Sequence, residues 1–540
     1  MASYILKVWI GACVIGFCLT GQPGIASTTP EPNKQVEIIP TDGCNMKIVD
    51  QLDSHFIITQ VDPPVHNWFA GRFTNLPIDK EVTISLRLEN AVGAVNVADV
   101  TKWRGLKPVM TYANPNKYDS YEWFRKDENG RWISGDPFKS GEVKYAGTGK
   151  VPIQSVIPVQ VAEEFLSTDG KYWQPWREIS SVEAIPATNT MRIKHHFELS
   201  EATIAMRIPY TYTYQQSMME KIKAAKFPGV CIDTIGITQE GRDIQIIRID
   251  DPKNPLRLSV QRVITGPPYI SFNNFIVTPP GRINSSDRRV IVMTAREHAT
   301  EQASSWVLIG ALNNLIHSNT QEISEERYKT YWLFIPMIDF DGSVHSKFDS
   351  LTDRYKYSTS IPVECAIYMR YLRSYIEAGY PIVLTSSWHN IECAEGPNIS
   401  SPYALRQDEE LTTTFNKLFF NSLKDLLVVP TTYSAQESGN IFSRLYSCCA
   451  KNYSSFALSF EINDRYPPRT LSLEQIQHVG AEFVPSIYGF VSQNSDMNMK
   501  IANIEMLLRK RIDCEKVYYS SQHHSGTIDN PSLLELFIGL

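Results

Sequence analysis

Two residue types that bind metal ions, a histidine and a glutamate, stand three positions apart at His298 and Glu301. The β-branched, apolar run before them, RVIVMTA (289–295), predicts a buried strand. From about Ser304 onward, apolar residues recur at the spacing of an amphipathic helix. A histidine in the connecting loop and a carboxylate where the helix begins can both turn toward one metal ion. The H-x-x-E pattern is weak alone, because such spacings arise by chance.

Three more apolar runs predict buried strands, and each one leads to or carries polar residues. The runs are YWLFIPMI (331–338), YPIVLTSSW (380–388) and SSFALSFE (454–461). They lead, in that order, to Asp339 and Asp341 with Asp353 and Arg354 further on, to His389, and to Glu461. Ligands of open α/β sheets bind at the carboxyl ends of the strands. The four strands are therefore expected to bring two histidines, two glutamates and an arginine to one edge.

Two histidines and one carboxylate, with a fourth position open to water, form a catalytic rather than a structural zinc site. The expected ligands are His298, Glu301 and His389. Zinc in such a site lowers the pKa of its water toward ~7 and polarises a carbonyl oxygen. The reaction then needs a base that is not a ligand. Glu461 is the candidate, because it ends another strand inside an apolar run that would desolvate it.

The composition is that of a globular protein with more than one domain. The chain has 540 residues, of which 43% are hydrophobic and 20% charged. That length favours two domains or three. A formal net charge of -6, without any Lys/Arg run, argues against a nucleic-acid partner.

The first 27 residues have the pattern of a signal peptide. Lys7 precedes an apolar run, VWIGACVIGFCL (8–19), and small residues follow, with expected cleavage after Ala26 or Ser27. The run is shorter than the ~20 apolar residues of a membrane-spanning helix. We expect an exported protein, periplasmic, envelope-associated or secreted, without a stable membrane span after signal removal. A lipid-modified Cys18 is the alternative, so release and membrane anchoring both stay open.

The remaining chain divides into two regions with different sequence patterns and a C-terminal tail. Residues 36–209 contain short alternating runs separated by Pro, Gly, Asn and Asp clusters, which favours a β-sandwich. From 210 to 493, strands alternate with helices, which is typical of an α/β domain with a largely parallel sheet. Residues 494–540 form a tail without a recognisable function. The cysteines form no C-x-x-C pair, so a structural zinc site is not supported.

The second domain resembles the zinc metallocarboxypeptidases, in the branch related to the cytosolic carboxypeptidases. AREHATE is similar to the family's A-R-x-H-P-G-E, and IPMIDFDGS to its P-x-x-N-P-D-G-V. LTDR is similar to D-L-N-R, and FALSFE to the Y-T-x-E strand that carries the base. In the first domain, HNWFAGRFTNL, GLKPVMT and MRIPYTYTY are similar to W-F-x-F-R-x-x-N-L, G-x-x-P-V and P-Y-T-Y of the same branch.

The resemblance implies an antiparallel β-sandwich followed by an α/β/α carboxypeptidase-like domain with a mixed, mostly parallel sheet. It implies one Zn²⁺ per chain and hydrolysis of C-terminal peptide or isopeptide bonds. Arg354 would hold the terminal carboxylate of the substrate, although Asp353 stands where the family has asparagine. The family's G-N-x-R is replaced by HSKFD, where Lys347 is the candidate for a substitute point charge.

Two other functions fit the same residues. Asp353 and Lys347 could rebuild the anchor for a non-peptide or cell-wall amide, which would make the protein a zinc amidase. Alternatively, the chain is a catalytically silent binding protein whose β domain carries the function. Testing hydrolysis of a mixed panel of peptides and muropeptide-like amides distinguishes these functions.

Overall fold

A computed structural model describes most of the chain between residues 35 and 493. The described residues are 35–61, 68–88, 99–112, 124–126, 132–134, 172–173, 176–179, 181–253, 255–264, 271–278, 289–317, 323, 327, 330–346, 363–378, 380, 382–390, 399–400, 409–424, 456–466 and 470–493. The expected signal peptide and the C-terminal tail lie outside these residues.

The first part of the chain forms two five-stranded sheets that share one buried core. One sheet has the order β1 (Glu37–Ile39), β4 (Ala70–Thr74), β13 (Ala202–Ala205), β6 (Val109–Thr111) and β10 (Arg177–Glu178). The other has the order β11 (Val182–Ile185), β12 (Thr190–His195), β5 (Val82–Arg87), β3 (His55–Gln60) and β2 (Met46–Leu52). This pair of sheets is the expected sandwich, and its described pairs are antiparallel except β3 with β5.

Alternation of apolar and polar residues explains how these short strands build a core. Phe56 and Ile58 of β3 and Ile84 of β5 are buried, as are Phe73 of β4 and Ile204 of β13. Residues two apart in a strand point to the same face, so each sheet contributes one apolar surface. Two 3-10 helices, η1 (Val100–Trp103) and η4 (Pro186–Thr188), and a small sheet in the order β8 (Trp132–Ser134), β7 (Phe124–Lys126), β9 (Tyr172–Trp173) complete this region.

The second part is built on one nine-stranded mixed sheet. Its order is β16 (Arg257–Ile264), β17 (Ser271–Thr278), β14 (Val230–Ile237), β15 (Asp243–Ile249), β19 (Thr330–Ile335), β18 (Arg289–Ala295), β20 (Ile382–Asn390), β22 (Phe456–Ile462) and β21 (Ile399–Ser400). The neighbours β19, β18, β20 and β22 are mutually parallel. The other described pairs are antiparallel. The sheet is mixed as expected, but its parallel part is confined to the centre.

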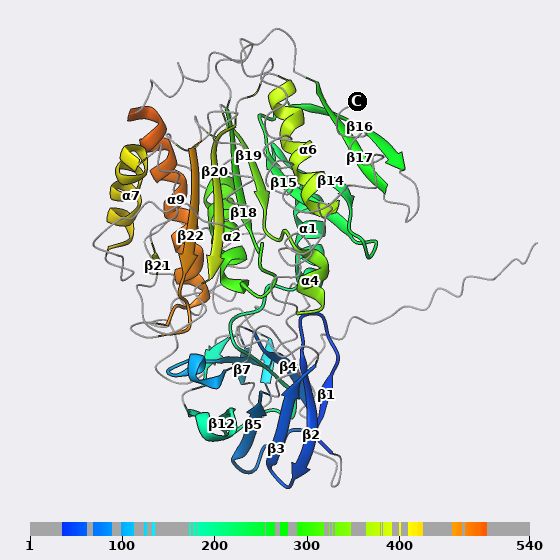
Figure 1. Cartoon of the computed structure of the whole chain (residues 1–540), viewed down its shortest axis with the longest axis vertical. Coiled ribbons are helices and arrows are strands. Elements are labelled where there is room, and N and C mark those ends of the chain that lie inside the picture. Colours follow the sequence, from blue (N-terminus) through cyan, green and yellow to red (C-terminus); the bar gives the residue numbers. More distant parts are fainter. Residues whose placement is uncertain are drawn as a thin grey trace, which may run out of the picture.

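Helices cover both faces of this sheet. They are α1 (Tyr212–Ala225), α2 (Gln302–His317), α4 (Phe340–Val344), α6 (Val363–Glu377), α7 (Glu409–Leu423) and α9 (Leu473–Gln493). In Figure 1, α6 lies in front of the strands and α2 lies behind them. α2 packs on β18 and β20 and against α9, whereas α6 packs on β14 and β17. Among the described helices, none is both long enough and apolar enough to cross a membrane.

The four apolar runs of the sequence are the four parallel strands. The run 289–295 coincides with β18, and the bounds of the others shift by one to three residues. His389, which was expected just after its strand, lies within β20, and Glu461 lies within β22, as expected. The helix expected from about Ser304 is α2. β19 and β20 are buried along their whole length, and β18 is buried after Arg289, which is why the apolar composition of these runs was informative.

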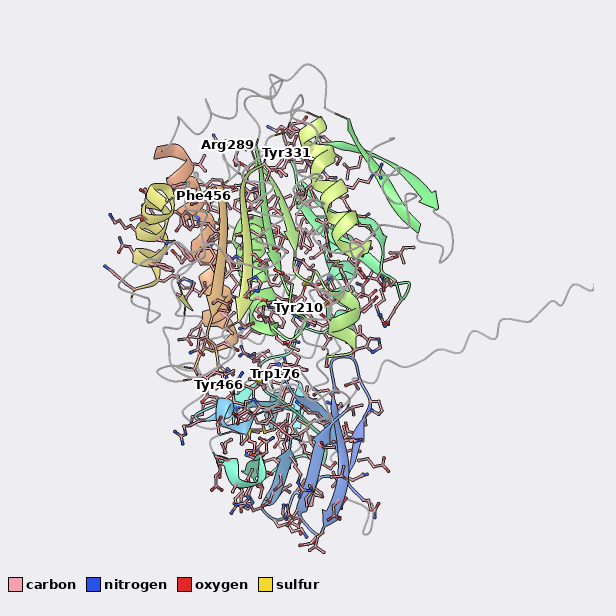
Figure 2. All side chains as sticks on the ribbon, viewed as in Figure 1. Trp176, Tyr210, Arg289, Tyr331, Phe456 and Tyr466 are labelled. Atoms are coloured by element: carbon pink, nitrogen blue, oxygen red, sulfur yellow. The ribbon has the colours of Figure 1, made fainter. Side chains whose placement is uncertain are left out.

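The carboxyl ends of the parallel strands point toward the sandwich. Arg289, Tyr331 and Phe456, which open or lie near the start of three of these strands, are at the end of the sheet far from the sandwich (Figure 2). Arg465, a few residues after β22, lies 3.6 Å from Glu178 of the sandwich region, and the labelled Tyr466 and Trp176 are both at this end of the sheet (Figure 2). The edge at which the candidate residues gather is therefore also the edge that the sandwich covers.

Candidate metal centre

His298, Glu301 and His389 form one cluster at this edge. Oε1 of Glu301 lies 2.8 Å from Nδ1 of His298, and its Oε2 lies 3.0 Å from Nδ1 of His389. The three residues each offer one ligand atom, and these atoms all lie within 4.8 Å of one another. Segments that are 88 residues apart in the sequence thus bring two imidazoles to one carboxylate.

The electrostatics of the cluster follow from its burial. His389 and Glu301 are buried, and His298 is partly exposed. Burial alone raises the pKa of the Glu301 carboxyl, but the charges of His298 and His389 outweigh burial and lower that pKa well below its usual range. Burial likewise lowers the pKa of His389, and the facing Glu301 carboxylate outweighs it, so the net pKa of His389 is raised. The cluster is a buried site that favours positive charge.

The loop between β18 and α2 gives Glu301 and His298 their positions. The Glu301 backbone N–H donates to the His298 carbonyl at 3.1 Å, which closes a tight turn just before α2 begins at Gln302. Arg296 starts the loop with a φ of 61°, in the left-handed region that non-glycine residues rarely adopt. Its Nε donates to the Ala299 carbonyl at 2.7 Å, inside the same loop. The loop is therefore fixed from within.

The Arg296 guanidinium also connects the loop to two other segments. It donates to the Tyr210 carbonyl at 2.7 Å and to Oε1 of Gln302 at 2.9 Å. A further bond reaches Oγ of Ser343 in α4 at 2.9 Å. Burial lowers the pKa of Arg296 to about 10, against the opposing effect of nearby acidic groups led by Asp42. A guanidinium with that pKa is charged at neutral pH.

Glu461 stands beside His389 on the neighbouring strand. The two residues are Cα partners in the parallel pairing of β20 with β22. Paired residues of adjacent strands leave the sheet on the same face. The negative charge of Glu461 is one of the groups that raise the pKa of His389. Glu461 is half-buried, whereas Glu301 is buried. Glu461 does not belong to the cluster of His298, Glu301 and His389, but its carboxylate adjoins that cluster.

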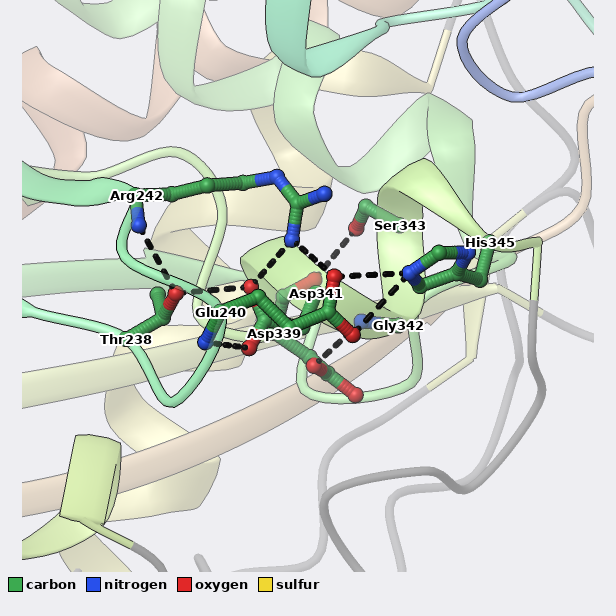
Figure 3. A network of polar contacts seen from close by, with 8 residues as sticks. All are labelled: Thr238, Glu240, Arg242, Asp339, Asp341, Gly342, Ser343 and His345. Carbon is green, nitrogen blue, oxygen red and sulfur yellow. Dashed lines mark hydrogen bonds and ion pairs between the residues drawn. The ribbon is translucent and has the colours of Figure 1, made fainter. Parts of the chain in front are cut away.

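Asp339 and Asp341, which follow β19, have structural partners instead. Oδ1 of Asp339 accepts the Gly342 N–H at 2.8 Å and caps α4. Oδ1 of Asp341 accepts from Thr238 at 2.7 Å and from Arg242 at 2.6 Å, so it links α4 to the turn between β14 and β15 (Figure 3).

The same turn carries Glu240, which bonds Arg242 at 2.6 Å and His345 at 2.7 Å (Figure 3). These carboxylates do not join the metal-binding group. Asp341 and Glu240 hold α4 against the β14–β15 turn.

The three residues expected to contact substrate, Lys347, Asp353 and Arg354, lie outside the described residues. Two described residues beside the cluster were not predicted. Glu297 is buried next to His298, and Ser387 lies two residues before His389 on the same strand face. Both adjoin a predicted ligand in the sequence, so their position was a usable signal. The directions in which the Glu297 and Ser387 side chains point could not be predicted, because they depend on the loop conformation and on the strand face that carries His389.

The donor set fits a zinc ion. Two imidazole nitrogens and one carboxylate are the ligands of catalytic zinc sites, and all three must lose or lack protons to bind metal. Here both Nδ1 atoms point at the same carboxylate. The described residues contain one group of at least three His, Cys, Asp or Glu side chains with this closeness, and it is this one.

Residues 216–368 match the family model described as zinc carboxypeptidase. This segment includes His298 and Glu301, while His389 and Glu461 follow it in the sequence. The family uses zinc, which agrees with the donor set of the cluster.

Solved structures with the same fold cover most of the chain. A putative carboxypeptidase A from Shewanella denitrificans OS-217 is 16% identical and covers 85% of this chain and 99% of its own, with a TM-score of 0.54. A metallo-carboxypeptidase from Burkholderia cenocepacia is 15% identical over 85% of this chain and 100% of its own, also with a TM-score of 0.54.

A metallo-carboxypeptidase from Pseudomonas aeruginosa, solved with (2-guanidinoethylmercapto)succinic acid, is 14% identical over 85% of this chain and 99% of its own, with a TM-score of 0.55. At these identities the likeness shows a shared fold. Its coverage extends over the sandwich as well as the nine-stranded sheet.

Proposed function

We propose that this chain, which carries a zinc carboxypeptidase domain, is an exported zinc metallocarboxypeptidase that hydrolyses C-terminal peptide or isopeptide bonds. One observation carries the proposal. Glu301 lies between Nδ1 of His298 and Nδ1 of His389, and Glu461 is paired with His389 on the adjacent strand. A carboxylate outside the ligand set, next to two imidazoles and a carboxylate of the kind that bind catalytic zinc, supports this function.

The division of labour among the residues follows from this arrangement. His298, Glu301 and His389 would hold one zinc ion, which would polarise the scissile carbonyl and bring the pKa of its water toward ~7. The Glu461 carboxylate accepts a proton from the attacking water. It then donates this proton to the nitrogen of the leaving amine, which completes amide hydrolysis.

Substrate recognition in this proposal rests on the sequence. Arg354 binds the terminal carboxylate as a bidentate partner, with Asp353 beside it. Lys347 supplies positive charge near the scissile carbonyl. Export rests on the signal-peptide pattern of residues 1–27. The motif resemblance to the cytosolic-carboxypeptidase-like branch stays a prediction.

The test is the Glu461→Gln substitution, which removes the proton acceptor and keeps the shape of the side chain. We expect turnover of C-terminal peptides to fall by about 10²–10⁴-fold, because general acid–base catalysis contributes that much. Zinc content is expected to stay near one ion per chain, because Glu461 is not a ligand. Peptide-library digestion read by mass spectrometry measures the first, and elemental analysis the second.

A matched control is Glu183→Gln in the sandwich, where Glu183 forms an exposed ion pair with Arg192. This variant should retain full activity, and a chelator should abolish activity in both it and the natural protein. Unchanged turnover in Glu461→Gln would contradict the mechanism. Cleavage of muropeptide-like amides without cleavage of any peptide would favour the zinc amidase, and zinc binding without any hydrolysis would favour the silent binding protein.

A further inference from the structure

Glu297 is a carboxylate that the proposed mechanism does not use, yet it lies against the metal-binding cluster. It is fully buried, directly between Arg296 and the ligand His298 in the sequence. Its Oε2 is 3.6 Å from Nε2 of His389, which comes from the other ligand segment. A buried carboxylate at the back of a metal-binding imidazole is costly unless it interacts with positive charge or a donor.

The orientation of His389 assigns different tasks to its two ring nitrogens. Nδ1 points at Oε2 of Glu301, 3.0 Å away, and is therefore the nitrogen that faces the metal position. Nε2 points the other way, 2.9 Å from Oγ of Ser387 and 3.6 Å from Glu297. A neutral imidazole that uses Nδ1 as a ligand must carry its proton on Nε2.

Ser387 and Glu297 together form an acceptor site for that proton. The Ser387 hydroxyl is at hydrogen-bond distance, while the Glu297 carboxylate is slightly beyond it and acts through its charge. A negative charge behind the imidazole favours the Nε2–H tautomer and makes Nδ1 a stronger electron donor. Such partners of metal-binding histidines typically change metal affinity by ~10–100-fold when they are removed.

We propose that Glu297, with Ser387, is a positioning residue of the metal centre that fixes the tautomer and the orientation of His389 and thereby strengthens zinc binding. The inference rests on the proposed function, since it needs zinc at His298, Glu301 and His389. It assigns a role to the residue between the arginine and the histidine of the AREHATE segment. Glu297 acts through His389 and does not contact substrate.

The test compares Zn²⁺ affinity in Glu297→Gln, Ser387→Ala and Glu364→Gln. Glu297→Gln keeps the volume of the side chain and removes its charge. Glu364 is the matched control, because it is an equally buried glutamate on α6, which packs on β14 and β17. Zn²⁺ dissociation constants come from competition with a chromogenic chelator. Ring ¹⁵N NMR of histidine-labelled, zinc-loaded protein reports which nitrogen of His389 carries the proton.

We expect Zn²⁺ to bind Glu297→Gln at least about 10-fold more weakly than the natural protein, and Glu364→Gln with unchanged affinity. In a double-mutant cycle, the losses from Glu297→Gln and Ser387→Ala should not be additive, because both residues act on the same N–H. In the zinc-loaded natural protein, the His389 signals should show a protonated Nε2, because Nδ1 is then the ligand, and a protonated Nδ1 would overturn the assigned tasks of the two nitrogens. If Glu297→Gln fails to fold, Glu297→Asp, which retains the charge, should bind Zn²⁺ more tightly than Glu297→Ala.

Two outcomes separate failure of this inference from failure of the proposed function. Natural protein that binds no Zn²⁺ at one ion per chain would remove the premise, and with it both proposals. Natural protein that binds Zn²⁺, with Glu297→Gln inside about twofold of the same affinity, would overturn only the role of Glu297. A lower melting temperature of metal-free Glu297→Gln with unchanged Zn²⁺ affinity would likewise show a merely structural role.

Discussion

Arg296 begins the loop of the candidate ligands His298 and Glu301 in a backbone conformation that residues with side chains rarely adopt. A φ in the left-handed region costs about 1–2 kcal/mol for a residue with a side chain. The four bonds of its buried guanidinium, to Ala299, Tyr210, Gln302 and Ser343, offset that cost. Three different segments therefore fix the residue two positions before His298.

Arg296→Lys tests whether this anchor stabilises the loop. A lysine has no planar fork and would leave some of the buried carbonyl groups without a donor. We expect the free energy of unfolding of the metal-free protein to fall by about 2–4 kcal/mol. Denaturant unfolding measures this. Arg192→Lys is the control, because Arg192 forms an exposed ion pair and should change stability by less than about 0.5 kcal/mol. Equal effects of both variants would contradict the role of Arg296.

At the residue scale, the sequence predicted the identity of the candidate ligands better than their surroundings. His298, Glu301 and His389 could be selected because each adjoins a buried apolar strand and has a metal-binding side chain. Glu297 and Arg296 could not, because their roles depend on the left-handed backbone at Arg296 and on contacts with Tyr210 and Ser343, which are distant in the sequence. Zinc binding by the three ligands stays a prediction.

At the scale of elements, the parallel strands were predictable because burial on both faces makes them continuously apolar. The antiparallel outer part of the sheet was not predictable. The sequences of β14 and β15 indicate strands, but nothing in them specifies which neighbour each strand pairs with. The structure places both antiparallel to their partners, so the parallel part of the sheet is smaller than expected. The packing of α2 against α9 was also invisible in the sequence.

The α2–α9 contact depends on two glycines, Gly310 and Gly480. A Cβ atom built on Gly310 would lie 1.7 Å from the Gln477 carbonyl oxygen, and one on Gly480 would lie 1.7 Å from the Val307 carbonyl oxygen. Backbone atoms cannot move aside as a flexible side chain can. We expect Gly310→Ala and Gly480→Ala each to lower the free energy of unfolding by about 1–3 kcal/mol or more, measured by denaturant unfolding.

Gly489, which is in α9 like Gly480, provides a control for which the opposite change in stability is expected. A Cβ atom built on Gly489 would have nothing within 4 Å. Gly489→Ala should raise the free energy of unfolding by up to about 1 kcal/mol, because alanine is the better helix former. If all three alanine variants changed stability in the same direction, the close approach of the two helices would not be what the glycines provide.

At the scale of the molecule, the sandwich is joined to the carboxyl edge of the nine-stranded sheet by several independent contacts. The Gly43 N–H donates to the Val344 carbonyl at 3.4 Å, and the Lys107 N–H to the Arg465 carbonyl at 3.0 Å. A third contact is the ion pair between Nη1 of Arg207 and Oδ1 of Asp464, 2.7 Å apart, with 1% and 0% of the side chains exposed. Asn390, the residue after His389, donates to the same Asp464 oxygen at 3.4 Å.

This ion pair predicts that the sandwich and the metal centre are energetically coupled. Arg207→Met would leave the buried Asp464 carboxylate next to Arg465, whose Nε is 3.6 Å from Oδ2. Breaking a buried pair costs about 3–5 kcal/mol, and the Arg465 contact places the expected loss near the lower end. Calorimetry should show a lower melting temperature, and Zn²⁺ affinity should also fall, because Asp464 positions Asn390 beside His389.

The double variant Arg207→Met with Asp464→Asn measures the interaction between the two residues separately from the contribution of each residue alone. It should be more stable than the sum of the two single losses predicts, because neither buried charge is then left without its partner. The exposed pair of Lys223 and Glu220 is the matched control, and Lys223→Met should change neither melting temperature nor Zn²⁺ affinity measurably. Additive losses in the double variant would mean that Arg207 and Asp464 stabilise the molecule independently, and that the sandwich is not coupled to the metal centre through them.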